Sequence, residues 1–211
     1  MCGLTAAGHV DGFGSQYAAM LSVVALSLER NETYYTTEWQ AMEHGEYGPA
    51  LFAFVGGPQF GSPAKDCTKV VKRSHSHRLI PGTLHRTAAL AARNYYTVPK
   101  PAKTNGLVVH VRRGDVKDGA RWTDYETIVS CLKKISCGEI HIVTEGHSDL
   151  EWAKKINATL HIDEAIDVSF HRMVSADCFL LAKSSLSWAA AFLSEGRLFS
   201  PYFKNSRVEV C

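Results

Sequence analysis

The sequence predicts an α/β fold built on a parallel, doubly wound sheet, and three observations support this prediction. From residue 107 onward, short apolar segments typical of strands alternate with segments of helical periodicity. The connections between them are short, as they are where crossover helices join neighbouring parallel strands. A proline-rich segment, residues 98–106, separates this half of the chain from an N-terminal half that has its own helices. We therefore expect two lobes, an N-terminal α/β lobe over residues 1–100 and a C-terminal lobe over residues 101–211.

The clearest element of the N-terminal half is a helix over residues 17–28. Its apolar side chains recur at helical spacing and fall on one face. A glycine-rich turn, residues 11–15, precedes it. A short run, residues 2–7, comes before that turn. We further expect strands over residues 33–37 and 68–72, helices over residues 49–55 and 84–96, and loops between residues 38 and 66.

In the C-terminal half the expected elements alternate regularly. Strands are predicted over residues 107–111, 139–143, 159–162 and 178–182, and helices over residues 123–134, 148–156, 170–176 and 185–194. Thr123 and Glu126 have the spacing of a capping box. In such sheets ligands bind at the carboxyl ends of the strands, beside helix N-termini, so we expect the functional residues there.

Composition limits the function classes. The chain has 211 residues, with 23 Lys and Arg against 21 Asp and Glu, a net charge of +2. This balance does not fit a protein that binds nucleic acid over a broad basic surface, so an anion site would have to be local. The six cysteines show no CxxC pattern, and we expect neither a zinc site nor a disulfide framework. Cys131 and Cys137 are interpreted as small, partly buried residues.

No membrane-spanning or targeting segment is predicted. The N-terminal residues lack a basic region followed by an apolar one, and the longest apolar stretches are too short to cross a bilayer. We expect a soluble protein, cytoplasmic, or lumenal if a targeting segment is missing. Asn31-Glu-Thr33 and Asn157-Ala-Thr159 are glycosylation sequons, which have meaning only in a secretory lumen.

Three segments carry residue types suited to binding phosphate. Arg112 and Arg113 follow the apolar strand at residues 107–111, and Gly114 breaks that strand so that both could reach a ligand. Ser184 and Ser185 stand at the start of a predicted helix, where hydroxyls and free N–H groups can hold an anion. The third segment is the turn with Gly12-Phe-Gly14. Each has a plain alternative: a solvated basic pair, an ordinary N-cap and an ordinary turn.

Together these segments resemble the fucosyltransferase superfamily that comprises the α-1,2, α-1,6 and protein O-fucosyltransferases. The matching motifs run in order from His110-Val-Arg-Arg-Gly-Asp115 through Phe170-His-x-Met-Val-x-Ala-Asp177 to Lys183-Ser-Ser-Leu-Ser187. Asp11-Gly-Phe-Gly-Ser-Gln16 is similar to the N-terminal glycine loop of that superfamily. The motifs span residues 11–187.

The resemblance implies a GT-B-like arrangement of two small Rossmann-like lobes with a cleft between them. It implies an inverting transfer of fucose from GDP-fucose to a glycan or protein hydroxyl, with no cofactor and no required metal. Carried over by position, the donor contacts would come from Gly12, Gly14 and Ser15 in the N-terminal loop, His110, Arg112 and Arg113 after the strand, and Ser184 and Ser185 before the helix. Arg112 and Arg113 would also stabilise the leaving GDP.

Four carboxylates are considered for roles in this comparison. The superfamily often has a carboxylate directly before the Phe-His pair, where this chain has Ser169, so we assign guanine recognition to Asp167. We expect Asp177 to be hydrogen-bonded beneath the arginine pair within the donor site. Asp115 and Asp118 are the candidate general bases, and Asp115 is placed among the catalytic residues.

Two alternatives stay open beside this function. The same phosphate contacts would serve a GT-B glycosyltransferase that uses another sugar nucleotide. The chain could also be a non-catalytic protein that binds a GDP-sugar or a glycan. The acceptor is not specified, because its contacts would come from loops, here within residues 38–82.

Overall fold

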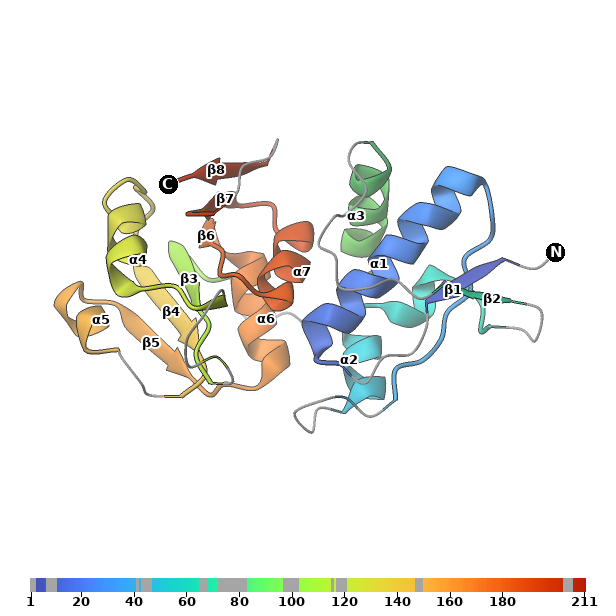
Figure 1. Cartoon of the computed structure of the whole chain (residues 1–211), viewed down its shortest axis with the longest axis horizontal. Helices are drawn as coiled ribbons and strands as arrows, with labels where there is room; N and C mark the ends of the chain where they lie inside the picture. The colour runs from blue at the N-terminus through green and yellow to red at the C-terminus, as the bar shows by residue number, and fades with distance from the viewer. Residues whose placement is uncertain are drawn as a thin grey trace. The chain divides into compact units, whose positions relative to one another are not determined.

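The computed structural model describes residues 3–6, 11–40, 42, 47–64, 68–71, 83–96, 103–114, 116, 121–146, 150–202 and 207–211, with the backbone alone for residues 83–86. Contacts within the chain divide it into two compact units, Met1–Pro99 and Lys100–Cys211. Both units mix helices with parallel strands, so the predicted α/β class is confirmed (Figure 1).

The described residues of the first unit form a small parallel sheet and four helical segments. Strands β1 (Leu4–Ala6) and β2 (Lys69–Val71) pair in parallel, and the helical segments are α1 (Phe13–Arg30), α2 (Gly48–Phe54), the 3₁₀ helix η2 (Gly57–Phe60) and α3 (Thr83–Tyr95). The strand expected over residues 33–37 is wrong. This segment forms only isolated bridges, in which Tyr34 pairs with Leu4 and Thr36 with Pro63.

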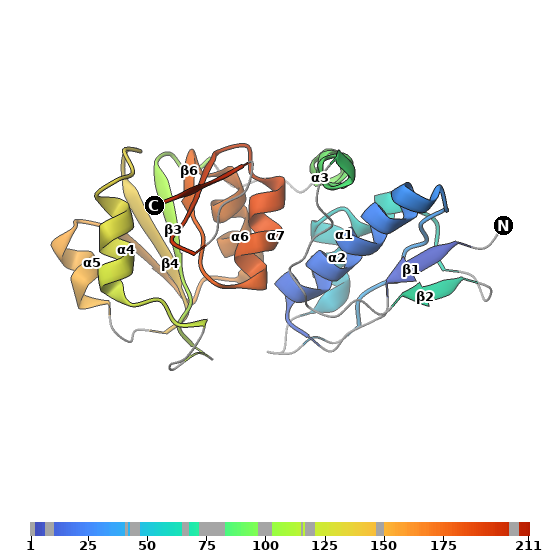
Figure 2. The same cartoon turned by 45° about the horizontal axis from the view of Figure 1, so that its top comes forward.

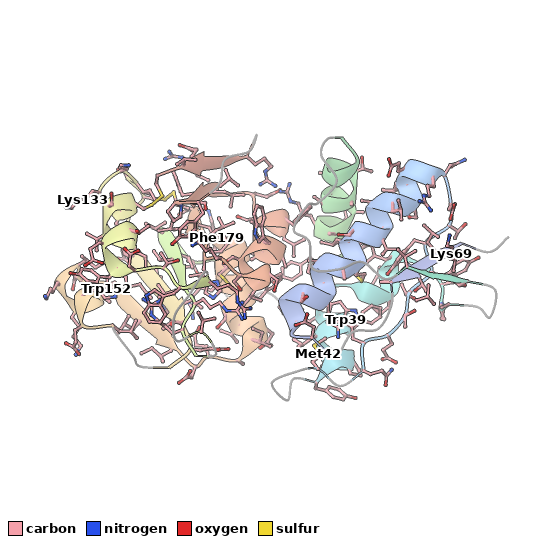
Figure 3. The ribbon with its side chains drawn as sticks, viewed as in Figure 1. Trp39, Met42, Lys69, Lys133, Trp152 and Phe179 are labelled. Atoms are coloured by element: carbon pink, nitrogen blue, oxygen red, sulfur yellow. A yellow bond between two sulfur atoms is a disulfide. The ribbon has the colours of Figure 1, made fainter. Side chains whose placement is uncertain are left out.

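An aromatic cluster fixes the start of α1 in this unit. The ring of Trp39 lies 5.9 Å from that of Phe13 and 5.4 Å from that of Phe52, both edge to face. Figure 3 shows Trp39 and Met42 beside the beginning of α1, near α2. Edge-to-face contacts of this kind add to the burial of apolar area. The helix that follows the glycine turn is therefore anchored at its first residue.

The second unit is a six-stranded sheet in which every neighbouring pair is parallel. Its strands are β3 (Leu107–Val111), β4 (Ile140–Thr144), β5 (Thr159–Ile162), β6 (Cys178–Leu180), β7 (Arg197–Ser200) and β8 (Val208–Val210), in the spatial order β5-β4-β3-β6-β7-β8. Numbered within the sheet this is the order 3-2-1-4-5-6 of Rossmann folds, whose topological switch point lies between the first and fourth strands. Here the switch point lies between β3 and β6.

Helices cover both faces of this sheet. In Figures 1 and 2, α4 (Tyr125–Leu132) and α5 (Glu151–Lys155) lie on one side, and α6 (Ile166–Ser175) and α7 (Ser185–Leu193) lie on the other. Val109, Ile142 and Leu180 pack in one buried cluster with Ile128 of α4 and Trp152 of α5. Because strand residues alternate in direction, the intervening residues of these strands face α6 and α7.

The start of α4 differs from the prediction. Asp124, not Thr123, is the N-cap, and its carboxylate accepts a hydrogen bond of 2.7 Å from the backbone N–H of Thr127. Asp and Thr both serve as N-caps, and sequence spacing alone does not distinguish two adjacent candidates.

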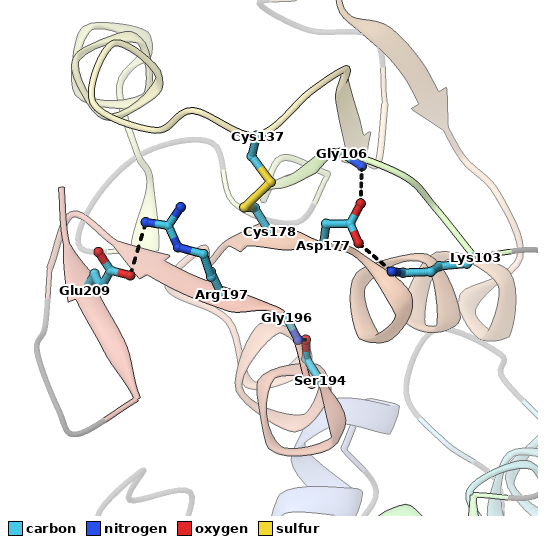
Figure 4. The surroundings of a disulfide bond; sticks show 9 residues. All are labelled: Lys103, Gly106, Cys137, Asp177, Cys178, Ser194, Gly196, Arg197 and Glu209. Atoms are coloured by element: carbon cyan, nitrogen blue, oxygen red, sulfur yellow. Dashed lines mark hydrogen bonds and ion pairs between the residues drawn. A yellow bond between two sulfur atoms is a disulfide. The ribbon is translucent and has the colours of Figure 1, made fainter.

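The expectation that the cysteines form no disulfide framework is also wrong. Cys131 is bonded to Cys211 and Cys137 to Cys178, at sequence separations of 80 and 41 residues. Cys137 precedes β4 and Cys178 begins β6, so the parallel sheet brings them to the same edge (Figure 4). Proximity of this kind follows from strand order, which cysteine spacing does not reveal.

Within the described residues, no helix is both long enough and apolar enough to traverse a lipid bilayer.

Candidate functional site

The predicted phosphate-binding segments of the second unit meet at the carboxyl edge of the sheet, at the switch point. After β3 the chain leads to α4 on one face, and after β6 it leads to α7 on the other. Arg112 follows β3 directly, and Ser184 lies at the end of the connection from β6 to α7. Gly114, in the turn after β3, has a left-handed conformation with φ of 54°, which favours glycine. The sequence therefore places a strand end and a helix start next to each other.

Arg112 contacts Ser184, the N-cap residue of α7. Its Nη1 lies 3.3 Å from Ser184 Oγ, and the Arg112 side chain is partly buried. Ser184 is the N-cap of α7, since its Oγ also accepts a hydrogen bond of 3.2 Å from the backbone N–H of Leu186. The structure thus matches the N-cap alternative for Ser184, and its role in holding an anion stays a prediction. A fixed cation stands beside the positive end of a helix, an arrangement that attracts an anion.

Arg113 points into the interior instead. Only 2% of the residue is exposed, and its guanidinium carbon lies 3.6 Å from the centre of the Trp122 ring. Nη1 donates to the carbonyl of Arg112 at 3.1 Å, and Nη2 donates to the carbonyl of Thr123 at 3.2 Å. The expectation that Arg113, like Arg112, reaches a ligand is wrong, because its guanidinium is buried against Trp122. Arg113 holds the backbone from which Arg112 extends.

His110 also faces α7. Its Nδ1 lies 2.6 Å from Ser187 Oγ, which in turn accepts a hydrogen bond of 3.1 Å from the backbone N–H of Ala182. Burial, together with the charge of Arg112, lowers the pKa of His110 to about 4. The imidazole is therefore neutral at neutral pH, and the serine hydroxyl can donate to Nδ1 while Nε2 carries the proton. Through Ser187 the ends of β3 and β6 are tied to α7.

Asp167 and Ser169 lie in the first turn of α6, which follows β5 at the same edge of the sheet. Asp167 is partly buried and accepts a hydrogen bond of 2.9 Å from the backbone N–H of Val168, whereas Ser169 is buried. In the strand order, β5 is two places from β3, which is about 10 Å at the usual strand spacing. Asp167 and Arg112 therefore both lie at the carboxyl ends of the strands of this sheet.

An ionic network holds the connection between β5 and α6. Arg172 donates to both carboxylate oxygens of Glu164, at 2.8 and 3.1 Å, and His161 Nδ1 lies 3.1 Å from the same carboxylate. Partial burial alone would raise the pKa of Glu164, but the hydrogen bonds and charge of Arg172 hold it below its usual range. The turn that leads to Asp167 is thereby fixed on both sides.

Asp177 lies at the opposite, amino edge of the sheet. It directly precedes β6, its Oδ2 accepts a hydrogen bond of 3.0 Å from the backbone N–H of Gly106, and its Oδ1 pairs with Lys103 Nζ at 2.5 Å (Figure 4). The prediction that Asp177 supports the arginine pair is wrong, because residues before and after parallel strands lie at different ends. Its contacts join the segment that precedes β6 to the segment that precedes β3.

In the first unit, Asp11 closes the glycine turn at the start of α1. Its carboxylate accepts hydrogen bonds from the backbone N–H of Gly12 at 2.9 Å and from Ser15 Oγ at 2.8 Å. Gly12 is the N-cap of α1 and Gly14 is buried in its first turn. This matches the plain alternative of a loop-to-helix turn, and the donor contacts assigned to Gly12, Gly14 and Ser15 stay predictions.

Two predicted residues lie outside the described part of the chain. These are Asp115 and Asp118, the candidate general bases. Conversely, sequence reasoning missed the roles of Trp122, Thr123 and Ser187. The signal for Ser187 was present, since it follows the N-cap Ser184 by three residues and so falls one turn along the same helix face.

Comparisons with known proteins give a structural resemblance only. No protein-family model and no curated protein matches the chain. NodZ α-1,6-fucosyltransferase from Bradyrhizobium, co-crystallized with GDP, is similar over 92% of this chain and 93% of that chain, with a TM-score of 0.54 and 9% identity. NodZ soaked with GDP-fucose gives a TM-score of 0.50 at 10% identity, over 92% and 93% of the two chains.

A variant of Arabidopsis thaliana FUT1 in complex with GDP gives a TM-score of 0.50 at 10% identity, over 99% of this chain and 72% of that chain. At such identities the similarity concerns the fold. It supports the predicted GT-B-like fold class.

Proposed function

We propose that this chain is an inverting glycosyltransferase that moves fucose from GDP-fucose to a hydroxyl of a glycan or a protein. The observation that carries the proposal is the contact between Arg112 and Ser184 at the N-terminus of α7, located at the switch point of a Rossmann-ordered sheet. The choice of nucleotide and sugar is supported by the fold shared with a fucosyltransferase that was co-crystallized with GDP and soaked with GDP-fucose.

In this proposal the diphosphate of the donor lies between the Arg112 guanidinium and the first turn of α7. Arginine binds phosphate oxygens with two parallel hydrogen bonds, and the first N–H groups of a helix have no partner within it. The neutral His110 lies behind this position and keeps α7 in register through Ser187. Arg113 acts as a positioning residue, because its guanidinium fixes the carbonyl of Arg112.

The transfer is a single displacement. The acceptor oxygen forms a bond to C1 of fucose while the bond from C1 to the β-phosphate oxygen breaks, and the electron pair leaves with GDP. The acceptor proton passes to a general base, for which we propose Asp115. Negative charge grows on the departing diphosphate, and fixed positive groups that meet it lower the barrier. Arg112 and the α7 N-terminus supply such groups without a metal ion.

Guanine recognition is proposed for Asp167. A carboxylate can accept hydrogen bonds from N1–H and the N2 amino group of guanine at the same time. Asp167 follows β5 at the carboxyl edge, so a nucleotide with its diphosphate at α7 would extend along this edge toward α6. The Glu164–Arg172 pair would hold the turn before Asp167 in place.

The test is release of GDP from GDP-fucose, measured with the purified chain in water and with added glycan acceptors. GDP-mannose and a UDP-sugar serve as alternative donors. Arg112→Ala is the test variant, and Arg197→Ala is the matched control, because Arg197 is an exposed arginine at the amino edge of the same sheet. We expect turnover with GDP-fucose, a loss of about 10²–10³ in rate for Arg112→Ala, and no change for Arg197→Ala.

Three outcomes would contradict parts of the proposal. Turnover only with another sugar nucleotide would support a glycosyltransferase and contradict the choice of fucose as the donor sugar. Tight GDP binding without turnover would favour a non-catalytic binding protein. Equal activity of the Arg112→Ala and Arg197→Ala variants would show that Arg112, at the carboxyl ends of the strands, takes no part in the transfer.

A further inference from the structure

The disulfides bear on where the chain resides. All four cysteines within the described residues are disulfide-bonded, and Cys131 and Cys178 are almost completely buried. Reducing systems of the cytosol keep thiols free, so stable disulfides are characteristic of secreted and lumenal proteins. Two bonds that join distant segments of one fold are therefore a mark of an oxidising compartment. In eukaryotic cells that compartment is also where asparagine side chains receive glycans.

Asn31 presents one sequon at the end of α1. It is the C-cap of that helix in a left-handed conformation, φ 51°, and its backbone N–H is bonded to the carbonyl of Leu28 at 3.3 Å. Asn31, Glu32 and Thr33 are all exposed. The backbone of the turn is thus held by the helix while the side chains of the sequon project outward.

Asn157 presents the second sequon in the same way. It follows α5 with φ of 53°, and its backbone N–H is bonded to the carbonyl of Lys154 at 3.3 Å. Its side chain is exposed, as is that of Thr159, the first residue of the edge strand β5. A glycan here would stand at the border of an open sheet edge, where bulky polar groups prevent pairing with other chains.

A left-handed helix end favours asparagine for conformational reasons, which would explain Asn31 and Asn157 without any modification. This explanation does not account for an exposed threonine two residues later at both sites. Within the described residues, only three positions other than glycine have positive φ, and two of them are the sequon asparagines.

We propose that the chain resides in an oxidising secretory compartment and carries N-linked glycans on Asn31 and Asn157. In this modification the amide nitrogen of asparagine forms a bond to C1 of the first sugar of a lipid-linked oligosaccharide. The bond from C1 to the lipid diphosphate breaks, and the amide loses one proton. The proposal is independent of the donor site and would hold for a catalytically silent chain.

The test uses the tagged, full-length protein isolated from the cells that encode it. Thiols are alkylated before reduction, and glycans are removed with a peptide N-glycosidase in ¹⁸O-water, which converts each modified asparagine to labelled aspartate. We expect label at Asn31 and Asn157 and no alkylation of the four bonded cysteines. Asn94, which is exposed but followed by no sequon threonine, is the internal control and should stay unlabelled.

Matched variants separate the sequon from the turn. Thr33→Ala and Thr159→Ala should each remove one step of the electrophoretic shift caused by deglycosylation, while Thr33→Ser and Thr159→Ser keep it. An unlabelled asparagine in protein with intact disulfides would overturn the proposal at that site. Free thiols at all four cysteines would contradict the proposal that the chain resides in an oxidising compartment.

Discussion

Arg113 is the buried member of the arginine pair, and Arg113→Ala removes three contacts at once. These are the hydrogen bonds to the carbonyls of Arg112 and Thr123 and the stacking of the guanidinium on Trp122. Because only 2% of the residue is exposed, water does not replace these contacts in the variant unless the structure opens. The substitution therefore acts on the stability of the second unit.

The expected magnitude follows from these contacts. Hydrogen bonds from a charged donor contribute about 1.5–3 kcal/mol each, and a desolvated cation–π contact contributes about 2 kcal/mol. Part of this sum is offset, since removal of a buried cation also removes its desolvation cost. We expect a net loss of about 3 kcal/mol, which in a unit of this size lowers the melting temperature by roughly 10 °C.

Arg112→Ala serves as the comparison. Its side chain is only partly buried and its bond to Ser184 is long at 3.3 Å, so we expect less than about 1 kcal/mol of lost stability. Melting temperature and GDP affinity are measured for both variants. We expect Arg113→Ala to lose stability and Arg112→Ala to lose nucleotide affinity. If Arg113→Ala melts like the unmodified protein and Arg112→Ala does not, the assignment of the two roles is refuted.

Three further perturbations have defined outcomes. Replacing Cys137 and Cys178 together by alanine should lower the unfolding free energy by about 4 kcal/mol, because the bond closes a segment of 41 residues. Dithiothreitol should lower the melting temperature of the unmodified protein by more than that of a variant in which Cys131, Cys137, Cys178 and Cys211 are all replaced. The pKa of His110 is lowered to about 4 from an ordinary value of 6.5, so on acidification the unfolded chain binds this proton before the folded chain does. The contribution of the neutral imidazole to the free energy of unfolding is therefore fully present above pH 6.5 and declines as the pH falls toward 4. A His110→Gln variant should show a shallower decline in a denaturant titration across that range. Transfer of fucose should persist in EDTA; a loss of activity restored by Mn²⁺ or Mg²⁺ would reject the metal-free mechanism.

Local sequence patterns predicted much of the second unit because each pattern acts over a few residues. The predicted strands at 107–111 and 159–162 have the bounds of β3 and β5, and apolar periodicity located every helix from α4 to α7 to within a few residues. Strands β7 and β8 were not predicted. They are only three or four residues long and β8 is largely exposed, so neither has a distinctive periodicity.

Properties that depend on the tertiary structure were not predictable in this way. The direction of Arg113 is decided by Trp122, which comes from a different segment and offers a ring for the guanidinium. Asp177 is close to the β6–α7 connection in sequence but at the opposite end of the strand in space. The disulfides likewise join residues that only the strand order brings together.

The position of the diphosphate can be seen in a crystal structure of the chain with GDP. We expect diphosphate oxygens within hydrogen-bond distance of the Arg112 guanidinium and of the first backbone N–H groups of α7, with guanine toward Asp167. GDP bound away from the carboxyl edge of the six-stranded sheet, or no bound GDP at saturating concentration, would contradict it.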